Sequence, residues 1–162
     1  MNIQILKKLF NLFLLLMLGI LSCKTVKKLP ATIAGASRAK LVGSWTLTNI
    51  SYDGLLPGSV QSLVGETIPD LKGGIWKLTN SGNGSYTLSN GNVQSIYWSY
   101  SNDNNVPTFQ FKKLYQGDKA RKVEEGYQLL ISNIDGAHMT LRYPIPLGDK
   151  TAYVLLHFEK LP

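Results

Sequence analysis

The chain has 162 residues and a formal net charge of +7, with 17 Lys and Arg against 10 Asp and Glu. Charged residues make up 17% and apolar residues 44% of the sequence, which excludes a globally disordered chain and allows a buried core. The length fits one domain with short appendages. Because there is a single cysteine, an intrachain disulfide is excluded.

The excess positive charge is concentrated near the N-terminus. Residues 1–22 contain Lys7 and Lys8, residues 23–40 contain five more basic groups, and the first acidic residue is Asp53. Residues 41–162 therefore carry ten positive and ten negative groups. A nucleic-acid-binding domain needs a basic surface of its own, so we expect no nucleic acid as a partner.

The first residues are typical of a secretory signal. Met1–Lys8 ends in two lysines, and residues 9–21 are almost entirely apolar. A run of this length is too short to cross a bilayer comfortably as a helix, which needs about 20 residues. The segment Ile20-Leu21-Ser22-Cys23 that follows resembles the lipobox of bacterial lipoproteins. This resemblance implies a lipoprotein signal peptide at 1–22 and acylation of Cys23, for example by palmitate.

Acyl chains on Cys23 would anchor the protein through membrane lipid, since each buried methylene contributes about 0.8 kcal/mol. Residues 23–40 lack a strand pattern and are interpreted as a basic flexible tether. Two interpretations of its five positive groups stay open. They either lie against anionic head groups, at roughly 1 kcal/mol each, or are simply solvated.

Residues 41–162 read as short strands separated by turns rich in Gly, Asn, Asp and Pro, without a long amphipathic helix. Short links permit only antiparallel neighbours, which leaves a sandwich or a closed barrel. Sequential hairpins favour an all-β, eight-stranded antiparallel up-and-down barrel. The predicted strands are Ser44–Tyr52, Gly74–Asn80, Ser85–Ser89, Val93–Tyr100, Thr108–Tyr115, Gly126–Ile131, His138–Tyr143 and Thr151–Lys160.

A register can be predicted for the last three strands. A three-residue loop at residues 134–136 and a turn centred on residues 147–148 put the apolar side chains on one face and His138 opposite His157 on the other. The predicted apolar pairs are Ile131 with Met139, Leu129 with Leu141, Tyr127 with Tyr143, Met139 with Leu156, Leu141 with Val154 and Tyr143 with Ala152.

The start of this domain, Leu41–Leu47, resembles the Gly-x-Trp opening of lipocalins, and in particular the lipocalin-like lipoproteins of Bacteroidota. The strand Gly74–Leu78, the Asn-Gly-rich turn before Tyr86 and the closing strand Tyr153–Leu161 agree with that group in order and spacing. The resemblance implies a lipocalin-like β-barrel in which Trp45 packs across the closed end as a structural plug. It also implies lipid anchoring at the outer membrane, and the absence of acidic residues after Cys23 favours a periplasm-facing position.

A small eight-stranded barrel either fills itself with side chains or holds one small apolar ligand, and both interpretations stay open. The apolar face carries no charge in the last three strands before Lys160, so any ligand there would be apolar. The residues predicted to contact such a ligand are Phe109, Phe111, Tyr127, Leu129, Met139, Leu141, Tyr143 and Val154.

We expect no enzyme, no cofactor and no metal. His138 and His157 could supply half of a zinc site, but no further ligand completes it. Glu124 and Glu125 are an acidic pair among basic neighbours, which is typical of a solvated loop. The serines lack a Gly-x-Ser-x-Gly elbow, so the sequence identifies no hydrolase nucleophile.

Two hypotheses for function remain. The first is a membrane-anchored barrel that binds or carries a small hydrophobic ligand in the cell envelope. The second is a non-catalytic accessory subunit of an outer-membrane protein assembly, using its outer face or the segment Asp53–Gly73. This segment is unusually apolar for a loop, which indicates either a covered barrel mouth or a partner surface. A helical turn is predicted within it, around Ser59–Val64.

Overall fold

The computed structural model describes residues 35–120 and 126–162. The predicted signal peptide, Cys23, most of the predicted tether and the pair Glu124–Glu125 lie outside the described residues. Within the described ranges, no helix has the length and apolar character needed to cross a membrane.

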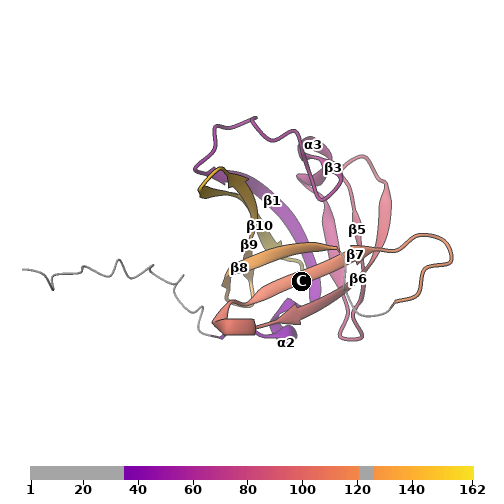
Figure 1. Ribbon diagram of the computed structural model, residues 1–162. Coiled ribbons are helices and arrows are strands. Elements are labelled where there is room, and N and C mark those ends of the chain that lie inside the picture. The colour runs from indigo at the N-terminus through magenta and orange to yellow at the C-terminus, as the bar shows by residue number, and fades with distance from the viewer. Residues whose placement is uncertain (1–34, 121–125) are drawn as a thin grey trace, which may run out of the picture.

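Eight antiparallel strands form a closed up-and-down barrel, as the sequence predicts (Figure 1). Each predicted strand overlaps one observed strand, because alternating side chains and Gly- or Asn-rich turns set both the period and the breaks. The closed order is β1-β10-β9-β8-β7-β6-β5-β4. The bounds are β1 Gly43–Asp53, β4 Ile75–Leu78, β5 Asn83–Thr87, β6 Val93–Ser101, β7 Thr108–Lys113, β8 Tyr127–Ile134, β9 His138–Leu147 and β10 Lys150–Lys160.

The barrel has two different ends (Figure 1). The short helix α2 (Arg38–Leu41) lies at the end where β1 begins, here called the α2 end. Residues 54–74, which follow β1, lie at the opposite end, together with the hairpin of β2 (Ser62–Leu63) and β3 (Glu66–Thr67) and the helix α3 (Ile68–Leu71). This is called the hairpin end. A 3₁₀ turn at Asp103–Asn105 links β6 to β7.

The predicted apolar face of the last three strands is confirmed, but the predicted pairing was wrong by two residues in both hairpins, and by three between the β8–β9 turn and a β-bulge at residues 131–133. Leu141 pairs with Ile131 and with Leu156. A shift of two residues leaves every side chain on its predicted face, because successive residues of a strand alternate between faces. The other observed apolar pairs are Ile134 with Met139, Met139 with Phe158, Tyr143 with Val154 and Ala152 with Ile145.

Turn chemistry explains the shift. The Asp135 carboxylate accepts hydrogen bonds from the backbone N–H groups of Ala137 and His138, at 2.9 and 2.7 Å, and so fixes the first turn at residues 135–137, one residue later than predicted. The second turn is centred on Gly148 and Asp149, with Leu147 paired to Lys150.

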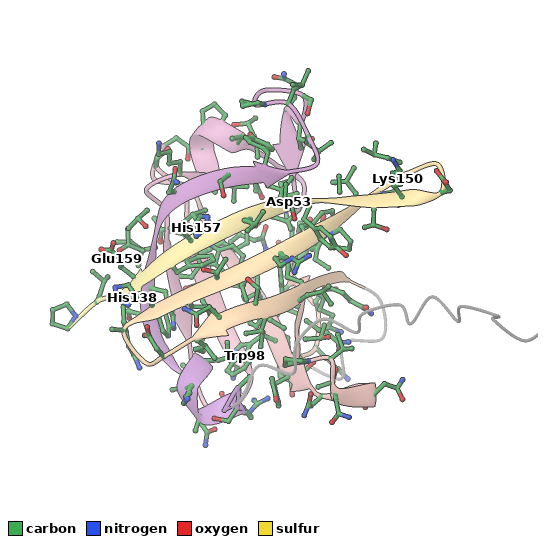
Figure 2. The ribbon with its side chains drawn as sticks, turned by 90° about the vertical axis from the view of Figure 1, so that its left-hand side faces the viewer. Asp53, Trp98, His138, Lys150, His157 and Glu159 are labelled. Carbon is green, nitrogen blue, oxygen red and sulfur yellow. The ribbon has the colours of Figure 1, made fainter. Side chains whose placement is uncertain are left out.

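The same shift separates the two histidines that were predicted to face each other. His157 pairs with Thr140, and His138 pairs with Glu159. The predicted cross-strand histidine pair is therefore wrong. Figure 2 labels His138, His157 and Glu159 and shows them on the outside of the barrel wall.

Strand β9 contains Pro144 and Pro146, which a fully paired strand would not tolerate. Beyond Arg142, β9 pairs with β10 alone, because its last partner on β8 is Leu130. The edge of β9 that faces away from β10 is therefore unpaired there, and a proline whose missing N–H would point to this edge removes no hydrogen bond from the sheet. The β9–β10 hairpin therefore continues past the barrel wall, as the position of Lys150 in Figure 2 shows.

The α2 end is sealed around Trp45. This side chain is fully buried, and its indole Nε1–H donates a 2.8 Å hydrogen bond to the carbonyl of Leu41. The ammonium group of Lys160 lies 5.2 Å from the ring centroid. Trp45 thus lies at one end of the barrel, which is the location that its predicted role as a plug requires.

Residues just before the predicted domain boundary also pack on this end. The Arg38 guanidinium lies 4.3 Å from the ring centroid of Trp98 and donates to the carbonyl of Asn80. The Tyr100 hydroxyl donates a 3.0 Å hydrogen bond to the carbonyl of Ala36. Among the described residues, packing on the barrel therefore extends back to Ala36, within the last part of the segment interpreted as a tether.

A column of aromatic rings fills the interior between the two ends. Trp98 stacks on Phe109, with centroids 5.8 Å apart, Phe109 contacts Phe111 at 5.8 Å, and Phe111 contacts Tyr127 at 5.1 Å. Trp76 packs edge-on against Phe111 at 5.3 Å. Such contacts contribute about 0.5–1.5 kcal/mol per pair beyond the burial of their area.

Phe111 lies at the centre of this column, so its truncation should remove most of these contacts. We expect Phe111→Ala to lower the free energy of unfolding by about 3–5 kcal/mol, because it leaves a cavity among rigid rings. Tyr115→Ala, at a side chain that is 65% exposed, should change it by less than about 0.5 kcal/mol. Urea denaturation of both variants measures the difference. Equal effects would contradict this account of the core.

Candidate functional site

All eight side chains predicted to contact a ligand belong to the interior of the barrel. Tyr127 and Tyr143 are half-buried and pack against the core. The structure thus brings the predicted set together, and neighbouring rings within it are in contact. The other six, which are buried, are Phe109, Phe111, Leu129, Met139, Leu141 and Val154.

The β2–β3 hairpin covers the end of this interior. It forms a two-stranded sheet of its own and makes no backbone ladder with the strands of the barrel. Leu63 and Val64 at its tip are each only 3% exposed and belong to the same core cluster as the barrel residues. The apolar character of the segment Asp53–Gly73 is therefore used largely to cover the barrel.

The helical turn predicted around Ser59–Val64 was wrong. Residues 62–63 form β2, and the helix of this segment is α3, at Ile68–Leu71. Thr67 precedes α3, and its hydroxyl accepts a hydrogen bond from the N–H of Asp70, while Pro69 occupies the first turn. These are the residues that favour a helix start, and they lie after the predicted position.

A polar site lies beneath the hairpin, where one carboxylate meets two donors. The Tyr86 hydroxyl donates a 2.6 Å hydrogen bond to Glu66 Oε1. The ammonium of Lys113 donates to the same oxygen at 2.5 Å and to the carbonyl of Gly65 at 3.5 Å. The side chains of Lys113 and Glu66 are only 11% and 19% exposed, so the ion pair is largely removed from water.

Strand geometry explains why the two donors point inward. Lys113 lies two and four residues after Phe111 and Phe109 on β7, and therefore shares their inward face. Tyr86 on β5 pairs with Trp76 on β4, and the two rings stack with centroids 4.9 Å apart. The Lys113 ammonium lies 6.0 Å from the Tyr86 ring centroid.

The surroundings set the protonation states of this site. Burial alone would raise the pKa of Glu66, but the hydrogen bonds from Lys113 and Tyr86 and the charge of Lys113 outweigh burial and lower it. The nearby Asp70 opposes this lowering weakly. Burial, followed by the Glu66 carboxylate, raises the pKa of Tyr86, so its hydroxyl stays a donor.

The hairpin tip is strained and closely fitted. Val64 has a φ of +50°, which costs a β-branched residue about 1–3 kcal/mol. Gly65 follows with a φ of +75°, and a Cβ there would lie 2.9 Å from the Tyr127 hydroxyl and 3.0 Å from Lys113 Nζ. The backbone angle favours glycine at this position, and a Cβ would also displace the ends of the Tyr127 and Lys113 side chains.

Few polar contacts hold the hairpin to the barrel. In the described part of the chain, the hydrogen bonds that join residues 62–67 to barrel strands all involve Lys113 or Tyr86. Its apolar contacts come from the buried side chains of Leu63 and Val64, and the chain then continues into α3, which buried Leu71 and the Ser89 N–H hold to the barrel. The hairpin is therefore the part of the barrel interior that can separate without breaking the barrel sheet.

Sequence reasoning missed Lys113, Tyr86 and Glu66 as a site. The signal for Lys113 was its place in the predicted strand Thr108–Tyr115, on the same face as two phenylalanines. Glu66 could be recognised only as one of three acidic residues in an otherwise apolar segment, and its partner is 47 residues away along the chain.

A second polar cluster lies on the outer wall. His157 Nε2 lies 2.7 Å from the hydroxyl of Ser51, and its Nδ1 lies 3.3 Å from the hydroxyl of Thr140. A serine nucleophile of the usual kind needs a carboxylate on Nδ1 to stabilise the imidazolium. In this cluster His157 Nδ1 faces the Thr140 hydroxyl instead of a carboxylate, and His157 on β10 links Ser51 on β1 to Thr140 on β9.

The remaining histidine belongs to a loop. His138 lies 3.2 Å from the Asp135 carboxylate on an exposed turn. The backbone N–H groups of His138 and Ala137 and the His138 side chain lower the pKa of Asp135 to about 2. Among the residues that the structure describes, no three His, Cys, Asp or Glu side chains are grouped to hold a metal ion.

Comparison of the chain with protein-family models, curated proteins and solved structures gives no match.

We expect the closure of the hairpin to depend on pH through this ion pair. The folded state lowers the pKa of Glu66 below the ordinary 4.5. The ionised Glu66 therefore stabilises the closed hairpin fully above pH 4.5, and this stabilisation is lost as the pH falls through the lowered pKa. We expect amide exchange at Glu66 and Ile68, corrected for intrinsic rates, to accelerate on acidification in this window.

The variant Glu66→Gln is the control, because it keeps the side-chain shape and removes the titrating group. Its hairpin should exchange at a rate that shows no step over the same pH window. A step of equal size in Glu66→Gln would mean that another group governs the transition.

Proposed function

We propose that this protein is a lipid-anchored, lipocalin-like barrel of the cell envelope that binds or carries a small hydrophobic molecule. The observation that carries the proposal is the hairpin end. There, a segment outside the barrel sheet buries the apolar side chains of Leu63 and Val64 against an aromatic interior. A molecule of similar size and polarity fits the same surroundings once the hairpin moves away.

The arrangement of the barrel supports binding at this end rather than at the other. The α2 end is sealed by Trp45, which is fully buried and hydrogen-bonded to the chain that enters the barrel. The interior rings near that end, Trp98 and Phe109, stack on each other. We therefore place the ligand among the residues nearer the hairpin, including Phe111 and Tyr127.

The proposed anchor is compatible with access from a membrane. The chain enters the barrel at the α2 end, and about a dozen residues separate Cys23 from the first described residue. At about 3.3–3.6 Å per residue, such a segment reaches roughly 40 Å when extended. That reach lets either end of the barrel approach the bilayer, in the outer membrane and facing the periplasm.

One observation favours the accessory-subunit alternative. Antiparallel topology places several exposed apolar side chains at the hairpin end, after β1 and β7, at the start of β6 and at the end of β9. Such residues are typical of a surface that contacts another protein. They are Leu56, 79% exposed, Val93, 66%, Tyr115, 65%, and Leu147, 46%.

Anchoring is tested by growing cells with an alkyne analogue of palmitate and detecting its incorporation into the protein. We expect labelling of the wild type, none in Cys23→Ala, and retention in Ser22→Ala, because a small residue before the cysteine is kept. Cys23→Ala should also appear in the aqueous fraction after detergent phase separation. Labelling of Cys23→Ala would overturn the anchor.

Ligand binding is tested by extracting the native protein in mild detergent and identifying co-purifying small molecules and proteins by mass spectrometry. We expect an apolar small molecule, with occupancy altered in Gly65→Ala, since a Cβ there displaces the hairpin. Gly136→Ala is the matched control, because Gly136 also has a positive φ but faces open space at the opposite end. A stoichiometric protein without any small molecule would support the accessory subunit instead.

A further inference from the structure

We infer that Lys113 and Tyr86 form a binding site for the carboxylate of an apolar acid, and that Glu66 occupies this site in the closed barrel. The inference rests on the proposed function and specifies its ligand class: a molecule with one carboxylate and an apolar chain. The hairpin tip is then a built-in occupant that the ligand replaces.

The two donors converge on a single point. Lys113 Nζ and Tyr86 Oη both donate to Glu66 Oε1, from strands β7 and β5 on the barrel wall. Neither donor belongs to the hairpin. They therefore stay on the barrel wall when the hairpin separates, whereas both acceptors, the Glu66 carboxylate and the Gly65 carbonyl, leave with the hairpin.

The charge of Lys113 requires an anion in this position. Its side chain is 11% exposed and lies near the Tyr86 ring, which stacks on Trp76. A largely buried ammonium without a partner is strongly unfavourable. An apolar molecule without charge could replace Leu63 and Val64, but it would leave Lys113 unpaired. A carboxylate restores the pair, and it also accepts the hydrogen bond of Tyr86.

The hairpin tip itself shows which chemistry fits. Leu63 and Val64 supply apolar groups buried against the barrel interior, and Glu66 supplies a carboxylate at its edge. An acid with an alkyl chain has the same two parts in the same relation. The strained φ of Val64 lowers the stability of the closed form relative to the ligand-bound one.

The experiment compares an acid with an alcohol of equal chain length. Dodecanoate and dodecan-1-ol, each labelled with carbon-13 at the first carbon, are titrated into the full chain in phosphatidylcholine nanodiscs. Empty nanodiscs correct for partition into lipid. Carbon-13 NMR separates the bound resonance, and circular dichroism confirms that each variant is folded.

We expect wild-type protein to bind dodecanoate at least about tenfold more tightly than dodecanol, as a charge-assisted hydrogen bond supplies. Lys113→Met should abolish this preference, whereas Lys112→Met, at the neighbouring outward position of β7, should keep it. Glu66→Gln should bind dodecanoate about tenfold more tightly than wild type, because the internal competitor is gone.

Three results would overturn the inference. Equal affinity for acid and alcohol in the wild type would show a barrel that binds apolar ligands without this carboxylate site, so the proposed function would stand alone. A preference for dodecanoate that persists in Lys113→Met would likewise show that Lys113 does not bind the carboxylate. Absence of binding in both wild type and Glu66→Gln would overturn the proposed function as well. If Lys113→Met does not fold, Tyr86→Phe decides, with a severalfold loss of preference expected and an unchanged preference counting against the site.

Discussion

The inward-facing ammonium of Lys113 is the constraint on which the hairpin end depends. A charge on the apolar face of β7 can be accommodated only with a paired anion, and the chain supplies one from a separate segment. The pairing positions Glu66, fixes the Tyr86 hydroxyl as a donor and brings the hairpin tip close to Tyr127. Part of the preference for glycine at position 65 follows from that close approach.

The two ends of the barrel are closed by different kinds of interaction, and this difference has consequences for function. At the α2 end, Trp45 is held by a backbone carbonyl and by strand pairing with Trp76 and Lys160, so opening it would break the barrel itself. At the hairpin end, the β2–β3 hairpin itself is held by one ion pair, one hydroxyl and two apolar side chains, while the adjoining α3 is fixed by buried Leu71 and by the Ser89 N–H donating to the Asp70 carbonyl. Local opening draws on the less stable parts of a fold, and here those parts lie at the hairpin end.

Sequence patterns predicted the barrel well because its strands and turns are each encoded by a few neighbouring residues. Each strand is defined by alternation over a few residues, and each break by turn-forming residues such as those at 80–84. The predicted pairing of β8 with β9 was wrong because the Asp135 side chain fixes the turn one residue later than expected, and that of β9 with β10 because its turn is centred on Gly148 and Asp149. Alternation encodes neither position. The apolar face was nevertheless predicted correctly, because a shift of two residues leaves each side chain on the same face of the sheet.

The candidate site was harder to predict, for a reason that lies in the charge count. Residues 41–162 carry equal numbers of positive and negative groups, which makes the domain look electrostatically unremarkable as a whole. What matters is the face on which each charge lies. Alternation along β7 places Lys113 inward, yet it says nothing of its partner, since Glu66 is joined to it only when the segment between β1 and β4 folds over the barrel. An ionisable residue on an apolar strand face is thus the feature of the sequence that indicates a site, whereas the identity of its counterion is set by tertiary structure.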